Sequence, residues 1–233
     1  MSVSRYFFTL GSVAVLATGC QKDTLEDCPG QCTVVNGRLL TSGQQGLAGA
    51  TVTVYWQNYY GYIGDQQRTK ARAVTDANGT YQLRFYIKDD ELLKGNFKLV
   101  CAADTQQYYT FQGEGPSLAP KRDTTYQLRP YLIPRKATVL VTVPNASQIP
   151  VSGMFLLFQS AHGYQLTLRA NASKSGTVYT VYQQPGAATV AATVAADQPV
   201  FINTSRLRNG APVITLDSLV VAAGTTSSLT VPY

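Results

Sequence analysis

Few side chains in this sequence could carry out nucleophilic catalysis, because it contains a single histidine, His162. A serine or cysteine nucleophile usually needs a neighbouring base, and histidine is a common one. His162 follows Ser160 at a predicted strand end that runs into a turn at Gly163, and no Gly-x-Ser-x-Gly elbow surrounds that serine. The pattern predicts a surface turn residue at His162, so we expect neither an enzyme activity nor a cofactor.

Two clusters could in principle hold a metal ion. Asp89, Asp90 and Glu91 carry oxygen ligands of the kind that bind Ca²⁺, but the spaced pattern of a calcium loop is absent. Cys28 and Cys32 have no second cysteine or histidine pair to complete a tetrahedral zinc site. We therefore predict no metal site and interpret the acidic cluster as a solvated run of charges.

The N-terminus indicates export. Met1–Arg5 carries one positive charge, and the uncharged, mainly apolar run from Tyr6 to Thr18 is too short to span a bilayer. This predicts a cleaved signal peptide over residues 1–19. The run Leu16-Ala17-Thr18-Gly19-Cys20 resembles the lipobox of bacterial lipoproteins, which implies cleavage before Cys20 and acylation of its thiol. The alternative is an ordinary secretory signal with an incidental cysteine.

A short tether, residues 20–31, follows the lipidated cysteine. Gln21, Lys22 and Asp23 resemble the lipoprotein export signal of Bacteroidetes, although Thr24 interrupts the acidic run. The resemblance implies a protein attached to the outer membrane through its lipid anchor and exposed at the cell surface. A polar tether on a periplasm-facing anchor is the alternative.

The remaining cysteines are Cys28, Cys32 and Cys101, and an oxidising compartment would allow two of them to form a disulfide. Cys101 shares a predicted strand face with Phe97 and Leu99, which we expect to be the core. We prefer a bridge from Cys101 to Cys28 or Cys32, which would tie the tether to the fold. A local Cys28–Cys32 bridge is the competing arrangement, and the spacing leaves both open.

The charges are sparse, at 14% of the residues, with a formal net charge of +6. A loose basic cluster lies in the middle of the chain, but no nucleic-acid-binding motif accompanies it. A basic balance alone supports solubility or weak attraction to anionic polymers, so we expect no nucleic-acid partner. The cluster consists of Lys121, Arg122, Arg129, Arg135 and Lys136.

The candidate ligand-binding residues are Tyr59, Tyr60 and Tyr62. They follow Trp56, which continues the predicted inward face of a strand and is expected in the core. The tyrosines then fall in the next loop, where aromatic rings with polar tips could stack on a sugar or contact a protein. Loop packing or a contact between domains is the alternative.

Strand patterns dominate the rest of the sequence. Asp76-Ala77-Asn78-Gly79 is strong turn chemistry, and Tyr81, Leu83, Phe85 and Ile87 then alternate with polar residues as in a half-buried strand. Upstream, Val35-Asn36-Gly37-Arg38-Leu39 leads through glycines into a second alternating run. These segments resemble the carboxypeptidase regulatory-like domain, which implies a prealbumin-like β-sandwich over residues 32–134.

A break between sheets is predicted where Pro130 and Pro134 bracket a short apolar piece, because proline is confined to strand edges and turns. A new alternating run begins at Ala137, and strand-like segments continue to Tyr233. We therefore predict an all-β fold with two β-sandwich domains in tandem after the signal peptide, the second, plausibly Ig-like, over residues 135–233. A single larger sandwich is the alternative.

The leading functional hypothesis is a non-catalytic, lipid-anchored cell-envelope protein that presents a binding or adhesion surface to a glycan or protein ligand. The alternative is a structural spacer or an accessory subunit of an outer-membrane complex.

Overall fold

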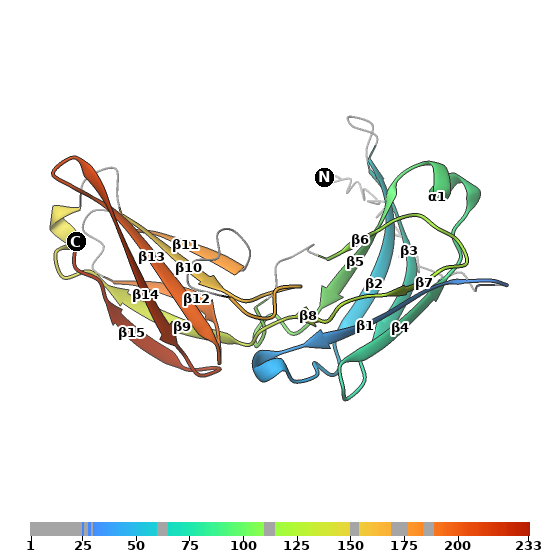
Figure 1. Cartoon of the computed structure of the whole chain (residues 1–233), viewed down its shortest axis with the longest axis horizontal. Helices are drawn as coiled ribbons and strands as arrows, with labels where there is room; N and C mark the ends of the chain where they lie inside the picture. The colour runs from blue at the N-terminus through green and yellow to red at the C-terminus, as the bar shows by residue number, and fades with distance from the viewer. Residues whose placement is uncertain are drawn as a thin grey trace, which may run out of the picture.

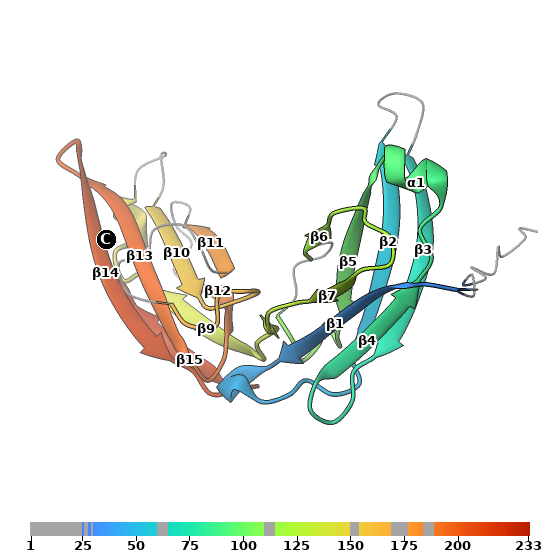
Figure 2. The ribbon, with the colours of Figure 1, turned by 45° about the vertical axis from the view of Figure 1, so that its right-hand side comes forward.

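The fold is all-β and consists of two sandwiches that meet at one end (Figure 1). The computed structural model describes residues 25, 28, 30–59, 65–109, 115–149, 154–168, 177–183 and 189–233, without the side chains of residues 59, 65 and 177–183. Figure 2 shows the two sandwiches diverging from their meeting point like the arms of a V. The predicted fold class is confirmed.

The first sandwich consists of two sheets, one mixed and one antiparallel. One has the order β4-β1-β7, with β8 also paired to β1, and the other has the order β3-β2-β5-β6. The strands are β1 (Thr33–Leu40), β2 (Thr51–Tyr59), β3 (Asp65–Val74), β4 (Thr80–Phe85), β5 (Asn96–Ala102), β6 (Ser117–Leu118), β7 (Thr125–Gln127) and β8 (Tyr131–Leu132). Among the described residues, two short helices connect them, the 3-10 helix η1 (Ser42–Gln44) and α1 (Asp89–Leu93).

The second sandwich has sheets of order β11-β10-β13-β14 and β12-β9-β15. In the second of these, β15 runs parallel to β9 while β12 runs antiparallel to it. The strands are β9 (Lys136–Thr142), β10 (Met154–Ser160), β11 (Thr177–Gln183), β12 (Thr189–Ala195), β13 (Pro199–Arg208), β14 (Ala211–Val220) and β15 (Thr226–Thr230), and a 3-10 helix η3 (Ala146–Gln148) follows β9.

The turn before β4 forms as its sequence predicts. The Asp76 carboxylate accepts the N–H groups of Asn78 at 2.9 Å and Thr80 at 2.8 Å, and Gly79 has a φ of 75°. Gly79 also lies so close to the Leu39 carbonyl that a Cβ atom would clash with it. Positive φ and close backbone approach both require glycine. The turn starts β4 with its apolar residues facing the core, and burial alternates along the strand.

Each sandwich has its own core. The first buries large aromatic side chains, with Phe85 and Phe97 at a ring-centroid distance of 5.6 Å and Trp56 beside them in the same cluster. The second is lined mainly by aliphatic residues from the inward positions of β9, β10, β12 and β13. Ala137, Val139, Val141 and Val143 are among its buried residues, so the alternation predicted for this stretch is confirmed.

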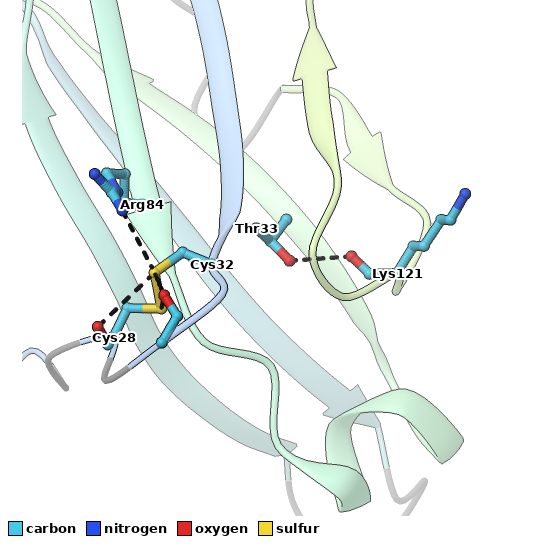
Figure 3. Close-up of a disulfide and its surroundings, with 6 residues drawn as sticks. Cys28, Cys32, Thr33, Arg84 and Lys121 are labelled. Carbon is cyan, nitrogen blue, oxygen red and sulfur yellow. Dashed lines mark hydrogen bonds between the residues drawn. A yellow bond between two sulfur atoms is a disulfide. The ribbon is translucent and has the colours of Figure 1, made fainter.

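The structure corrects the preferred disulfide. Cys28 is bonded to Cys32 (Figure 3), and Cys101 is a free thiol. Cys32 adjoins Thr33, which pairs with Phe85 at the end of β4. Cys101 pairs with Val52 at the other end of the sandwich, near the turn that starts β4. A disulfide needs Cα atoms within about 7 Å of each other, so the length of the sandwich excludes the predicted pairing.

Cys101 nevertheless lies where the sequence predicts, on the face of β5 that points to the core. It packs against the core of the first sandwich, and burial raises the pKa of its thiol to about 12. A thiol with so high a pKa is almost entirely protonated at neutral pH and is therefore a weak nucleophile. Cys101 is a packing residue in this fold.

Candidate ligand pocket at the domain junction

The short strand β8 is hydrogen-bonded to both sandwiches. β8 runs parallel to β1, with Tyr131 opposite Leu39 and Leu132 opposite Leu40. Leu132 also donates its N–H to the carbonyl of Gly163 at 2.7 Å and accepts the Gly163 N–H at 2.8 Å. Because Gly163 follows β10 of the second sandwich, β8 is bonded to both halves of the molecule. The junction is therefore a hydrogen-bonded structure and not a free linker.

Ser42 in η1 adds a polar connection at the same place. Its hydroxyl donates to the carbonyl of Ala196 and accepts the N–H of Arg135, both at 3.0 Å. Nearby, the N–H of Lys136 donates to the carbonyl of Gln107 at 2.8 Å. These bonds attach the beginning of β9 to two loops of the first sandwich.

Aromatic rings cover another part of the junction. Tyr131 meets His162 and Tyr164 edge to face, at ring-centroid distances of 5.7 Å and 5.3 Å. The guanidinium of Arg129 lies 5.1 Å from the centre of the Tyr164 ring. His162 is half-buried, and burial lowers its pKa to about 4, so the imidazole is neutral at neutral pH. The predicted turn is present, but the predicted surface position of His162 is wrong.

A cavity of about 490 Å³ lies beside the hydrogen-bonded links, between the two sandwiches. We call it the junction pocket. Its floor is the outer face of the sheet β12-β9-β15, where Thr138 and Thr193 lie directly opposite each other on neighbouring strands. The turn before β15 contributes Thr225, and a turn of the first sandwich contributes Gln106 and Gln107. Hydroxyl and amide groups from both sandwiches therefore face the same space.

Among the described residues, two cations line the junction pocket, Arg135 and Lys136, and no carboxylate does. The ammonium group of Lys136 donates to the carbonyl of Thr105 at 2.5 Å. Arg135 is exposed and makes no ion pair with any residue that the structure describes. Asp104, in the neighbouring turn, accepts the N–H of Gln106 at 2.8 Å. The pocket thus has a positive lining.

The loose basic cluster of the sequence is divided among separate environments. Arg122 forms an ion pair with Asp89 and lies over the ring of Tyr86, while Arg129 lies over Tyr164. Only the last two members of the cluster, Arg135 and Lys136, line the junction pocket. Spacing in the sequence could not separate these fates, because the partners come from other strands and loops.

Two smaller cavities have different linings. One of about 290 Å³ lies beside the apolar cluster of Leu40, Leu132 and Ala161, with Asp197 and Gln198 also lining it. Another of about 310 Å³ lies beside the Cys28–Cys32 disulfide. Arg84 lines it and donates to the Cys32 sulfur at 3.8 Å (Figure 3). The junction pocket is the largest of the three and has the most hydrogen-bonding groups from both sandwiches.

Several residues predicted as sites lie outside the described part of the chain. These are Cys20, Gln21, Lys22 and Asp23 of the anchor and export signal, and Tyr60 and Tyr62 of the candidate ligand-binding loop. Tyr59 is the last residue of β2, and its side chain is likewise outside the description. The predictions made for these residues stay predictions.

The acidic cluster does not behave as the predicted solvated run. It forms α1, in which Asp89 and Asp90 are exposed but Glu91 is fully buried. The Glu91 carboxylate accepts from the ammonium group of Lys70 at 2.8 Å and from the N–H of Lys88 at 2.9 Å. A buried charge is tolerated when it is paired and hydrogen-bonded, as Glu91 is. The sequence shows the acids but not the partner on β3.

Among the described residues, no group of histidine, cysteine, aspartate or glutamate side chains is arranged to hold a metal ion. Nor does that part of the chain contain a helix long and apolar enough to cross a membrane.

No family model matches the sequence, and no curated protein matches it. Among solved structures, the chain is similar to the TIE protein of Bacillus anthracis, at 10% identity over 87% of this chain and 34% of that one, with a TM-score of 0.31. It is also similar to a 9R-lipoxygenase from Cyanothece, at 17% identity over 48% of this chain and 18% of that one, with a TM-score of 0.31. A third is the shaft pilin SpaA of Lactobacillus rhamnosus GG, at 10% identity over 87% and 97% of the two chains, with a TM-score of 0.32.

The chain thus spans about a third of the TIE protein and under a fifth of the lipoxygenase. Likenesses at these identities and TM-scores carry no argument about function. The functional argument therefore comes from the residues of this chain.

Proposed function

We propose that this chain is a non-catalytic, lipid-anchored cell-envelope protein whose two sandwiches together present a binding site at the outer face of an outer membrane. The observation that carries this proposal is the junction pocket, to which both sandwiches contribute polar side chains. Ligand sites occur preferentially at domain interfaces, where two surfaces form a concave space. The lipobox-like sequence around Cys20 supports anchoring, since several acyl chains on one residue hold a soluble domain at a membrane.

The chemistry of the junction supports binding over catalysis. Its histidine, His162, is half-buried against Tyr131, and the nearby serine Ser160 is buried on the inward face of β10. Of the described cysteines, Cys28 and Cys32 form a disulfide and Cys101 has a thiol with a raised pKa. A nucleophile activated by a neighbouring base is the usual requirement of covalent hydrolysis. The described residues offer hydrogen bonds and positive charge instead.

A specific observation also favours the structural alternative. The bonds of Leu132 to Gly163 and of Ser42 to Ala196 and Arg135 connect the two sandwiches directly. Such a junction would suit a spacer or an accessory subunit that must hold a fixed shape. The two functions differ in their prediction for a ligand, because a spacer would keep its role when the junction pocket is blocked.

The first experiment is metabolic labelling with a palmitate analogue, followed by protease shaving and antibody labelling of intact cells. We expect the wild-type chain to carry the lipid and to be cleaved by external protease, whereas a Cys20→Ala variant carries no lipid and leaves the membrane fraction. A wild-type chain without lipid would contradict the anchor. A lipidated chain protected until the outer membrane is broken would place it on the periplasmic side and favour the accessory role.

A further inference from the structure

We propose that the junction pocket binds a carboxylate-bearing sugar, a uronic or sialic acid residue of a glycan. This inference rests on the proposed binding function and specifies its ligand class. It concerns a site formed by Arg135 and Lys136 at the start of β9 together with the threonine row on the outer face of the same sheet.

The charge of the lining selects an anion. Arg135 presents a guanidinium that is not engaged in an ion pair with the described residues, and this group matches the two oxygens of a carboxylate. Lys136 uses one of its three donors on the Thr105 carbonyl and keeps others for a ligand. Asp104 is the acidic residue of the adjoining turn, and its carboxylate already accepts the N–H of Gln106. Asp104 is not among the residues that line the junction pocket, so none of the described lining residues carries a charge that would repel an anion.

The neutral groups select a ligand rich in hydroxyls. Thr138 and Thr193 lie side by side on the floor, and their hydroxyls can each donate and accept. Thr225 donates its hydroxyl proton to the Ala222 carbonyl, so its oxygen remains an acceptor. The amides of Gln106 and Gln107 line the opposite wall. A sugar ring, with several hydroxyls around it, can use such donors and acceptors from two sides.

Other ligand classes fit less well. Among the described residues, no aromatic side chain lines the junction pocket, so this lining lacks the stacking surface on which single-stranded nucleic acid is bound. The floor also offers little to an extended peptide, which would need free backbone groups to add a strand. There the backbone groups already pair with one another. The N–H of Thr138 donates to the carbonyl of Thr225, that of Gly224 to the carbonyl of Lys136, and that of Lys136 to the carbonyl of Gln107. Recognition must then come from side chains.

The same backbone bonds hold the site in shape before a ligand arrives. Arg135 and Lys136 stand where β9 begins, and the backbone of Arg135 is bonded to the Ser42 hydroxyl while that of Lys136 is bonded to Gln107. A site built on such fixed backbone loses less conformational freedom on binding. The two cations are therefore positioned by the contact between domains, which makes the site a property of the paired sandwiches.

The test is titration calorimetry on the mature chain purified from membranes in detergent with its anchor intact. Trigalacturonate and 3′-sialyllactose serve as the two acidic probes and separate a uronate from a sialate ligand. The fully methyl-esterified trigalacturonate is the matched neutral probe. We expect one acidic probe to bind, the ester to bind at least about tenfold more weakly, and added salt to weaken the acidic probe.

The decisive variant is Arg135→Gln, which removes the guanidinium but keeps the backbone N–H that donates to Ser42. We expect binding of the acidic probe to weaken by about tenfold or more. Arg72→Gln is the control, since Arg72 is an exposed arginine on β3 away from the pocket and its loss changes the net charge equally. Thr193→Val should weaken binding of both the acidic and the esterified probe, because it removes a floor hydroxyl without changing charge.

Circular dichroism of each variant establishes that it is folded before its affinity is compared. Equal affinity for the acid and its ester would overturn the proposal, as would equal weakening by Arg135→Gln and Arg72→Gln. Binding of a peptide or an oligonucleotide at Arg135, without binding of either sugar, would also overturn the proposal. A lipidated chain that binds no acidic sugar would reject this ligand but leave the proposed function standing. Binding of an acidic sugar by a chain that carries no lipid would support this ligand but contradict the proposed anchoring.

Discussion

The two sandwiches have similar architecture but different interiors. The first surrounds Trp56, Phe85 and Phe97, all of them almost completely buried, and closes one end with the buried pair of Glu91 and Lys70. The second is filled mainly by valine, alanine, leucine and isoleucine side chains, and the antiparallel pairing of β13 with β14 runs the full length of both strands. One interior concentrates its contacts in a few large groups, and the other spreads them over many small ones.

This difference predicts different sensitivity to substitution. A large ring or a buried charge has many partners that cannot easily rearrange, so its loss leaves a cavity or an unpaired group. Small aliphatic neighbours can move partly into the space left by a lost side chain. We therefore expect single changes in the first sandwich to cost more stability than chemically similar changes in the second.

The largest effect is expected for Glu91→Ala. This change leaves the ammonium of Lys70, itself only 4% exposed in its side chain, without its carboxylate at 2.8 Å. Breaking a buried pair in this way costs about 3–5 kcal/mol. Denaturant unfolding measures the change in the free energy of unfolding.

The matched control lies in the same helix. Asp89 forms its ion pair with Arg122 at the surface, where its side chain is 90% exposed, so Asp89→Ala should change stability little. A combined Lys70→Met and Glu91→Met variant should recover much of the loss, because an apolar pair removes the unpaired charge. If Glu91→Ala cost no more than Asp89→Ala, the contrast between the two interiors would lose its main support.

The comparison becomes sharper with one substitution made in both cores. Leu99 on β5 and Leu156 on β10 are both fully buried, and both can be changed to alanine. Within the range observed for such changes, we expect a loss of about 4 kcal/mol for Leu99→Ala and about 2 kcal/mol for Leu156→Ala, because the core around Leu99 contains aromatic rings. Equal losses, measured by the same unfolding assay, would show that the second core is no more able to relax.

The junction should add a pH dependence that neither interior explains. Burial lowers the pKa of His162 to about 4, whereas an unfolded histidine titrates near 6.5. The unfolded chain therefore binds a proton first as the pH falls, and the stability that the neutral imidazole contributes is complete above about pH 6.5 and is lost toward pH 4. We expect a loss of about 3 kcal/mol between pH 7 and pH 4 from this group.

The measurement compares wild type with His162→Gln at both pH values, since titrating carboxylates act equally in the two proteins. Asp90 is one of them, because its hydrogen bond with Arg68 lowers its pKa. A variant with the same pH dependence as the wild type would show that His162 is accessible to protons in the folded chain.

Local sequence patterns were enough to predict the strands but not their partners. The turn at Asp76 and the alternation that follows it depend on neighbours within a few residues, and both are present in the structure. The burial of Glu91 depends on Lys70, which precedes it by a turn, a strand and a loop. A run of acids looks solvated in a sequence because the distant cation is not part of the pattern.

The junction pocket shows the same limit. Pro130 and Pro134 indicate a break between sheets, and the structure places β8 between them. That β8 is bonded to both β1 and Gly163 follows from the sheet order, which no local pattern contains. Arg135 and Lys136 are visible in the sequence as part of a basic cluster, but two of the threonines that line the pocket with them come from β12 and the turn before β15. The positive charge was predictable and the pocket was not.

The smallest effect is expected at the disulfide, which lies at the edge of the first sandwich. Cys28 and Cys32 are four residues apart, and so short a loop restricts the unfolded chain little. The variant with both changed to serine should lose about 2 kcal/mol. Cys101→Ser should lose at least as much despite changing one atom, because it places a hydroxyl against the core of the first sandwich.

Alkylation of the unreduced protein followed by peptide mass analysis provides the check: Cys101 should be labelled in the unfolded chain and Cys28 and Cys32 should not. Labelling of Cys28 or Cys32 in place of Cys101 would mean that the disulfide spans the sandwich, and its removal would then cost as much as a change in the core.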